Sequence, residues 1–371
     1  MLNLRVVYIA IPSLLCIASI AAAQSNQYFE GQNHLIINSF AGKIIPHSDT
    51  LKPLTNGLVK GIHLSISQKV NGNKDWHNYH KMPDVGLSFI YIDLGDARVL
   101  GNAFGVQPVI SYQISKFDRF VIKTHLGLGI AYITEKYSPN QNPTNVAIST
   151  TVNYWSNASL MGYFNLSNRS NLSIGIETNH FSNGAIKKPN YGLNMMGVSI
   201  GFSYEIDNKE RVYGERSKTN SKYFTSKTGL ELAFGLGIKE VGPAGGIKYY
   251  PISASVEYQI PRNNVYHLMA GIDVMYDKSI RSHKALVNLP YTPLNDDFQV
   301  GIKAGILIPF HRLSIYGQFG FYLYNPNPRV TFHYQKFGIR YRINSNIHLQ
   351  TELKTHLNTA DHVVMGVAFR L

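Results

Sequence analysis

The residues best suited to chemistry in this sequence are a histidine and a serine two positions apart, His180 and Ser182. In an extended strand, residues two apart point to the same side, so the two side chains share one face. An imidazole can take the proton of an adjacent hydroxyl, and the pair can therefore act as general base and nucleophile. The segment 183–193 returns the chain into the next predicted strand, which begins at Asn194. An amide there fits the third place of a catalytic triad, where it would fix the tautomer and orientation of the imidazole.

The pair ends a segment of alternating polarity. One face of this segment is apolar and the other is small or polar: Leu172, Ile174 and Ile176 against Ser173, Gly175, Glu177 and Asn179. The segments 194–206 and 120–132 repeat the scheme. A soluble β-sandwich also alternates, but small and polar residues opposite apolar and aromatic ones are typical of the lumen and lipid faces of an outer-membrane barrel. The alternation puts His180 and Ser182 on the predicted lipid face, where a polar pair has no structural reason to stand.

Composition and the N-terminus agree with an exported membrane barrel. The 371 residues are 44% hydrophobic, 12% aromatic and 15% charged, which excludes a disordered chain. Residues 1–23 are predicted to be a secretory signal, with Arg5, an apolar stretch over 6–20 and small residues before Gln24. The single cysteine falls inside this segment, so the mature chain has no thiolate or disulfide chemistry. No later apolar run is long enough for a membrane helix, and a closed barrel is then the only way across a bilayer.

The strand pattern divides the chain into two distantly similar halves. About eight segments lie in 24–206 and about eight more in 228–371, separated by a polar connector over 207–227. The fold class is therefore all-β, an antiparallel outer-membrane barrel. Two eight-stranded units and one barrel of about sixteen strands both remain open, and the long connector favours two units because periplasmic turns are short.

The second half is predicted to lack the histidine–serine pair. When the halves are aligned, Thr355 and Leu357 take the places of His180 and Ser182. Three polar residues there are predicted to form a lumen network, namely Lys354, His356 and Asp361.

Other polar residues point to no further chemistry. His125 faces the predicted lumen as a structural residue. A set of metal-capable side chains has no spacing that specifies a metal site: Asp75, His77, His80 and Asp84, with Trp76 among them. The net charge of +13 is spread along the chain without a nucleic-acid motif, and it favours anionic lipopolysaccharide as a partner.

At this point the sequence resembles a known family. The stretch 180–183, followed by Pro189, Asn190 and Gly192, is similar to the signature of the PagL lipid A 3-O-deacylases. Two further stretches resemble PagL-like proteins of greater chain length, namely 83–89 and 100–104. The resemblance covers roughly residues 33 to 206. It implies an eight-stranded outer-membrane barrel that removes an ester-linked acyl chain from lipopolysaccharide at a site on its lipid-facing wall.

The resemblance also implies roles for individual residues. His180 would be the general base and Ser182 the nucleophile. Asn183, with nearby N–H groups such as that of Gly184, would form the oxyanion hole. Two loop residues just beyond the site are candidates to meet lipid A phosphates, or else are solvated loop lysines: Lys187 and Lys188.

Two departures from the family pattern concern the site. The best-known members carry a glutamate twelve positions after the serine, where this chain has Asn194. An amide can orient a histidine but cannot stabilise an imidazolium by charge, so slower turnover is expected. A family glycine three positions after the serine is Ala185 here, which puts the local turn geometry in question.

The sequence thus predicts an outer-membrane serine esterase that acts on lipid A and needs no cofactor. The alternative is a non-catalytic barrel, either a channel or a structural protein, that keeps the motif with Asn194 in place of the acid. A further alternative is an esterase or phospholipase that acts on other membrane lipids.

Overall fold

The computed structural model describes residues 32–207, 228–357 and 359–371. The predicted signal segment 1–23 and all of the predicted connector except residue 207 lie outside these residues. Within the described ranges, none of the helices has the length and apolar character needed to cross a membrane. The described chain forms two compact units, one with strands β1 to β8 and one with strands β9 to β17.

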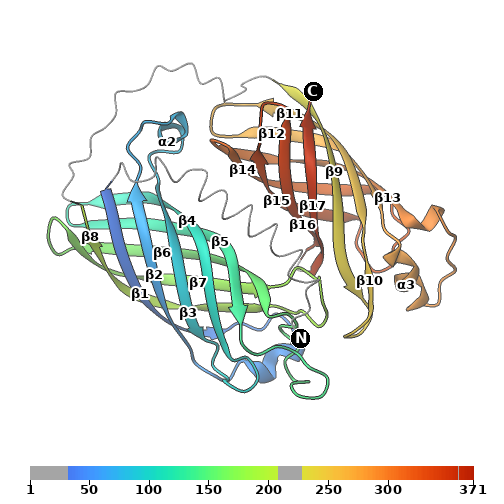
Figure 1. Ribbon diagram of the computed structural model, residues 1–371, viewed down its shortest axis with the longest axis horizontal. Helices are drawn as coiled ribbons and strands as arrows, with labels where there is room; N and C mark the ends of the chain where they lie inside the picture. The colour runs from blue at the N-terminus through green and yellow to red at the C-terminus, as the bar shows by residue number, and fades with distance from the viewer. Residues whose placement is uncertain (1–31, 208–227, 358) are drawn as a thin grey trace. The chain divides into compact units, whose positions relative to one another are not determined.

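Eight antiparallel strands close the first unit into a barrel (Figure 1). They are β1 (Gln32–Ile44), β2 (Val59–Lys69), β3 (Asp84–Asp93), β4 (Asn102–Phe117), β5 (Phe120–Ile133), β6 (Val152–Asn165), β7 (Ser170–Ser182) and β8 (Leu193–Glu205). Each strand pairs with the next in sequence and β8 pairs with β1, so the sheet has no free edge. Two short helices lie in the connections, η2 (Asp49–Leu54) and α2 (Asp75–Tyr79).

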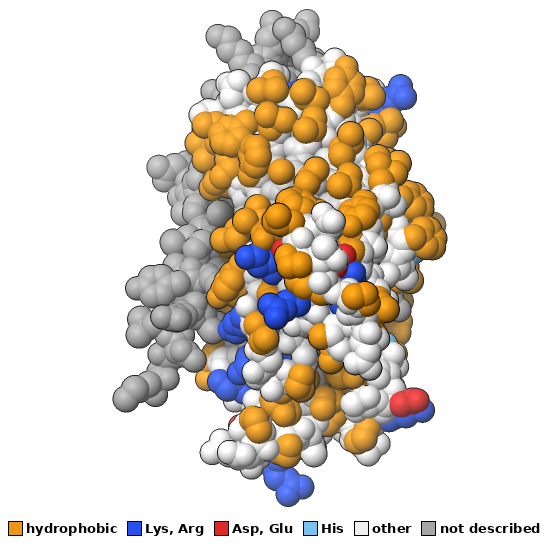
Figure 2. Space-filling model, turned by 90° about the vertical axis from the view of Figure 1, so that its right-hand side faces the viewer, with side chains coloured by type: hydrophobic (Ala, Val, Ile, Leu, Met, Phe, Trp, Pro, Cys, Tyr) orange, Lys and Arg blue, Asp and Glu red, His pale blue; other side chains and the backbone are white. Residues whose placement is uncertain are grey.

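The side chains of the first barrel follow the predicted alternation. On β7 the apolar residues Leu172, Ile174 and Ile176 are exposed, whereas Glu177 and Asn179 are buried in the lumen. Figure 2 shows one face of the molecule, without distinguishing the two units, and hydrophobic side chains are exposed over much of that face as well. An apolar outer wall around a polar interior is the arrangement that a lipid environment requires.

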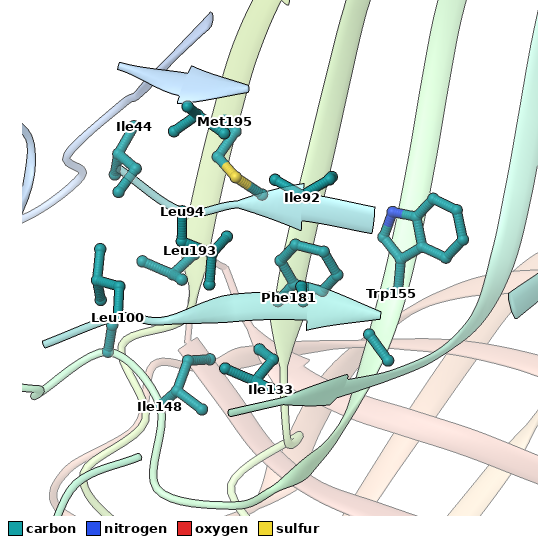
Figure 3. Close-up of a cluster of buried hydrophobic side chains, with 14 of the residues drawn as sticks. Ile44, Ile92, Leu94, Leu100, Ile133, Ile148, Trp155, Phe181, Leu193 and Met195 are labelled. Atoms are coloured by element: carbon teal, nitrogen blue, oxygen red, sulfur yellow. The ribbon is translucent and has the colours of Figure 1, made fainter. Parts of the chain in front are cut away.

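One end of the first lumen is filled by an apolar cluster (Figure 3). Trp155 and Phe181 are completely buried there and stack with ring centroids 6.4 Å apart. Further along the lumen, His125 is held between the hydroxyls of Ser111 and Tyr163 at 2.6 and 2.9 Å, which confirms its structural placement. The barrel wall at the end of β7 therefore rests on tightly packed side chains.

The set of metal-capable residues that includes Asp84 is not gathered around a common point. Asp84 forms an ion pair with Lys123 at 2.5 Å. In the described part of the chain, no three His, Cys, Asp or Glu side chains come together in a way that would hold a metal ion.

The second unit closes into a barrel of its own through pairing of its first and last long strands. Its ring consists of β9 (Gly229–Val241), β11 (Ile252–Pro261), β12 (His267–Tyr276), β13 (Phe298–Phe310), β14 (Leu313–Tyr324), β15 (His333–Arg342), β16 (Ile347–His356) and β17 (Thr359–Arg370). The short β10 (Ile247–Tyr249) pairs with the end of β9, outside the ring. Two helices lie between β12 and β13, α3 (Ser279–Ala285) and η3 (Asn295–Asp297). Two closed rings confirm two eight-stranded units rather than one barrel of about sixteen strands.

Charged side chains fill the lumen of the second barrel. At one level Lys303 lies 2.6 Å from Glu257 and 2.8 Å from Asp273, and Arg340 contacts Glu257 at 2.6 Å. All four side chains are buried, so each charge is compensated by a partner rather than by water. This layer fills part of the barrel interior with paired charges.

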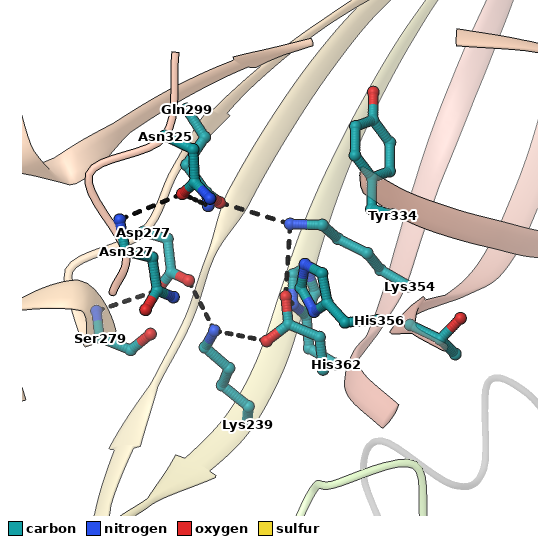
Figure 4. Close-up of polar contacts among 12 residues, drawn as sticks. Lys239, Asp277, Ser279, Gln299, Asn325, Asn327, Tyr334, Lys354, His356 and His362 are labelled. Atoms are coloured by element: carbon teal, nitrogen blue, oxygen red, sulfur yellow. Dashed lines mark hydrogen bonds and ion pairs between the residues drawn. The ribbon is translucent and has the colours of Figure 1, made fainter. Parts of the chain in front are cut away.

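The predicted lumen network of the second half lies at another level of the same barrel (Figure 4). Asp361 accepts from Lys239 at 2.7 Å and lies 3.3 Å from Lys354. His356 faces the lumen as predicted, and its hydrogen-bond partner is the Tyr322 hydroxyl at 2.8 Å. The lumen placement of Lys354, His356 and Asp361 is thereby confirmed.

Candidate active site

The last residues of β7 place His180 and Ser182 on the outer wall of the first barrel. They continue the outward-facing row that begins with Leu172, and both are half-buried. Phe181 stands between them and points the opposite way, into the apolar cluster (Figure 3). Because Phe181 is packed against rigid neighbours, the backbone that presents His180 and Ser182 is held firmly.

The neighbouring strand β8 brings Asn194 directly opposite His180. The Nδ1 atom of His180 and the Oδ1 atom of Asn194 are 2.6 Å apart. An amide oxygen can only accept, so the proton of the imidazole resides on Nδ1 and the lone pair on Nε2. This is the tautomer that a general base requires.

A second histidine, which the sequence patterns did not single out, contacts Asn194 from its other side. The Nδ2 atom of Asn194 lies 3.0 Å from Nδ1 of His47, a residue between β1 and η2. The N–H of Ile45 donates to the backbone oxygen of Asn194 at 2.7 Å, which extends the β1–β8 pairing and brings His47 alongside. Since Nδ2 is a donor, His47 accepts through Nδ1 and carries its own proton on Nε2. Asn194 thus lies between two imidazoles.

The loop after β7 supplies another amide to the serine. Nδ2 of Asn190 donates to Oγ of Ser182 at 2.8 Å, and Oδ1 of Asn190 accepts from the backbone N–H of Asn183 at 3.1 Å. The side chain of Asn183 is buried and donates to Oγ of Ser149 at 3.0 Å. Asn190 is therefore the amide beside the hydroxyl, and the Asn183 side chain is engaged inside the barrel wall.

Left-handed backbone shapes this loop at both ends. Gly184 and Ala185 follow each other with φ of 66° and 69°, and Gly192 has a φ of 76°. At Gly192, an added Cβ would lie 3.0 Å from Cε1 of His180 and 3.6 Å from Cβ of Ser182. A glycine is needed there because the backbone passes directly over both side chains.

The candidate residues lie at the end of β7, in the loop after it and at the start of β8. His180, Ser182 and Asn194 occupy adjoining positions on the outer wall. Gly184 lies in the turn directly after β7, and Lys187 and Lys188 follow in the same loop. Asn183, which was expected at the oxyanion hole, instead turns its side chain inward to Ser149, because it follows Ser182 with the opposite parity. The contacts of His47 and Asn190 were not expected, since they depend on closure of the barrel and on the path of the loop.

A lipid-exposed polar row on a closed eight-stranded sheet defines an outer-membrane β-barrel with a candidate active site open to the bilayer. Comparison with family models agrees: residues 60–203 match the lipid A 3-O-deacylase (PagL) model, and residues 228–371 match the model of the acyloxyacyl hydrolase C-terminal domain. The two models together match more than half of the chain, which belongs to the PagL-like lipid A 3-O-deacylase family. This family and the barrel fold indicate the outer membrane.

Solved structures of other barrels are also similar to the chain. The outer-membrane enzyme PagL matches with a TM-score of 0.33 and 16% identity, over 46% of this chain and 99% of that chain. A de novo designed transmembrane β-barrel matches with a TM-score of 0.26 and 16% identity, over 38% and 95% of the two chains. A mutant of the Rh. blastica porin matches with a TM-score of 0.18 and 8% identity, over 91% and 99%. The search of curated proteins gives no match.

Proposed function

We propose that this protein is a serine esterase that removes an ester-linked acyl chain from lipid A. The observation that supports this most is the 2.6 Å contact between His180 and Asn194 on the lipid-facing wall, next to Ser182. It leaves the lone pair of Nε2 as the base on the same face as the hydroxyl. Membership of the lipid A 3-O-deacylase family supports the substrate class.

The reaction proceeds in two halves. In the first, Nε2 of His180 takes the proton of Ser182 as Oγ attacks the carbonyl carbon of the ester. The resulting oxyanion collapses, the bond between this carbon and the lipid A oxygen breaks, and that oxygen leaves with the proton from His180. In the second half, water attacks the acyl-serine, His180 accepts the proton of water, and the free fatty acid leaves as Ser182 takes that proton back.

The donors near Ser182 suit the charge that develops on the ester oxygen. Asn190 Nδ2 lies 2.8 Å from Oγ, hence close to the carbon that Oγ attacks. The backbone N–H of Gly184 remains a proposed second donor. Asn183 then acts indirectly, because its N–H holds Oδ1 of Asn190 and so orients the other end of that amide.

The contact of Asn194 with His47 determines which way its amide faces. An amide orients the base correctly only when its oxygen faces the imidazole. A lone pair on Nδ1 of His47 favours this orientation, because it accepts from Nδ2 of Asn194 at 3.0 Å. We assign His47 as a positioning residue that acts through Asn194.

Substrate reaches the site from the side, out of the bilayer. The exposed apolar row that leads to His180, represented by Leu172, Ile174 and Ile176, offers a surface along which acyl chains lie. In this scheme Lys187 and Lys188 contact the phosphates of lipid A as point charges. Their replacement by glutamine would raise KM and leave kcat nearly unchanged.

The test is mass spectrometry of lipid A from cells that express the wild type, Ser182→Ala or Ser39→Ala. Ser39 is the matched control because it is an exposed residue on β1 of the same barrel. Heat-dependent migration in gels establishes that each barrel is folded. The wild type and Ser39→Ala should remove the mass of one acyl chain, whereas Ser182→Ala should leave lipid A intact.

Other outcomes are equally informative. Loss of an acyl chain in Ser182→Ala would show that the nucleophile lies elsewhere. Intact lipid A in all three samples would favour the non-catalytic barrel. Phospholipids from the same extracts show whether a folded wild type acts on another lipid instead.

A further inference from the structure

The second barrel holds a cavity that the proposed esterase does not use. It has a volume of about 400 Å³ and lies at one end of the lumen, where all eight strands of the ring contribute lining residues. This volume falls within the range of roughly 300–1,000 Å³ that is typical of small-molecule sites. The cavity is lined within this barrel alone.

Arginines dominate the lining. Four of them border the cavity, together with a single carboxylate from Glu231: Arg312, Arg340, Arg342 and Arg370. Glu231 already contacts Arg340 at 2.7 Å and lies 3.8 Å from Arg370. Glu257, which also contacts Arg340, is a second carboxylate close to the lining. Even when it is included, four guanidinium groups face two carboxylates, and the cavity keeps an excess of positive charge.

Buried polar atoms in the same lining also point to a ligand. Nε2 of Gln259 and Nδ1 of His267 are buried and have no hydrogen-bond partner among the described residues. Both side chains are less than a tenth exposed. Buried polar groups nearly always find a partner, and an anion in the cavity would provide one for the amide and, in the Nδ1–H tautomer, for the imidazole.

The cavity borders the charged layer of the same barrel, because Arg340 in its lining contacts Glu257, which also pairs with Lys303. The lining includes the short turns His311–Arg312 and 343–345, whereas the long connection with α3 and η3 lies at the other end of β13. Short turns of outer-membrane barrels lie on the periplasmic side, so a ligand would enter from there.

We propose that this cavity, the basic cup of the second barrel, binds a phosphorylated ligand. Guanidinium groups present planar pairs of donors that match phosphate oxygens, and they remain charged at any physiological pH. The phosphate belongs either to a soluble molecule of the periplasm or to a lipid headgroup. None of the residues that line the cup belongs to the esterase site of the first barrel.

The experiment is a calorimetric titration of the full-length protein in neutral detergent micelles with inorganic pyrophosphate at low salt. The wild type should bind saturably, and binding should weaken as salt is raised. Arg312→Gln and Arg342→Gln should each weaken binding roughly tenfold, the factor expected when one charge-assisted hydrogen bond is lost. Arg329→Gln is the matched control, because Arg329 is exposed in the connection at the opposite end of β14.

Two results would overturn the proposal. One is the absence of binding by a folded wild type at millimolar pyrophosphate, and the other is an equal loss of binding in Arg329→Gln. A second titration in micelles that contain phosphatidic acid separates the two sources of phosphate. Competition by this lipid assigns the cup to a headgroup, and undiminished pyrophosphate binding assigns it to a soluble ligand.

Discussion

Replacement of Asn194 by aspartate is expected to make this protein a faster esterase. The substitution preserves shape, so the acceptor stays 2.6 Å from Nδ1 of His180. In the transition state His180 carries the proton of the serine and is positively charged, and a carboxylate stabilises this charge where an amide only aligns the ring. His47 can follow the change by donating to the new oxygen through Nδ1, so no polar atom loses its partner.

The size of the gain follows from the two kinds of hydrogen bond. A neutral hydrogen bond contributes about 0.5–1.5 kcal/mol, and one to a charged group about 1.5–3 kcal/mol. The midpoints of these two ranges differ by about 1.25 kcal/mol, which corresponds to a roughly eightfold increase in kcat. The Ser182 nucleophile and its surroundings are unchanged, so KM should stay within about twofold.

The assay is hydrolysis of a medium-chain p-nitrophenyl ester by the purified protein in neutral micelles. Asn346→Asp serves as control, because it makes the same charge change at an exposed turn of the second barrel. An unchanged or lower kcat in a folded Asn194→Asp variant, with the control equal to wild type, would refute this account of Asn194.

Three further predictions use the same assay or an unfolding measurement. His47→Ala should lower kcat by up to about tenfold when residue 194 is asparagine. In Asn194→Asp the loss should be much smaller, because the two carboxylate oxygens both accept and need no orientation. Equal losses in both backgrounds would count against a positioning role for His47. Gly192→Ala should lower kcat by at least roughly tenfold, because the new Cβ would press on the ring of His180 from 3.0 Å, and a kcat equal to wild type would contradict the close approach. Ala185→Gly should raise the free energy of unfolding in urea by up to about 1 kcal/mol, since alanine is strained at a φ of 69°; destabilisation would show that the turn is relaxed.

The sequence was sufficient for the features that depend on strand parity. Alternation along β7 places His180 and Ser182 on the lipid face, and the hairpin to β8 brings Asn194 opposite the histidine. The family resemblance implied a place in the oxyanion hole for Asn183, but its side chain has the opposite parity to Ser182 and bonds Ser149 inside the barrel wall instead. The period of a strand determines the face to which each of these side chains points.

Contacts between distant segments required the three-dimensional structure. His47 meets Asn194 only because β1 pairs with β8 and closes the barrel, which joins residues 147 positions apart. Asn190 reaches Ser182 through a loop whose path depends on left-handed residues. In the second barrel, alternation indicates that charged side chains face the lumen, but the pairing of Lys303 with Glu257 depends on the stagger of the strands.

The central claim is that Ser182 is a nucleophile activated by His180 on the outer wall of the barrel. Covalent capture with a long-chain fluorophosphonate, followed by mass mapping of peptides, tests it most directly. The account predicts an adduct on Ser182 in the wild type and a strong decrease of labelling in His180→Ala. An adduct on another serine, or an unlabelled Ser182 in protein that still deacylates lipid A, would contradict it.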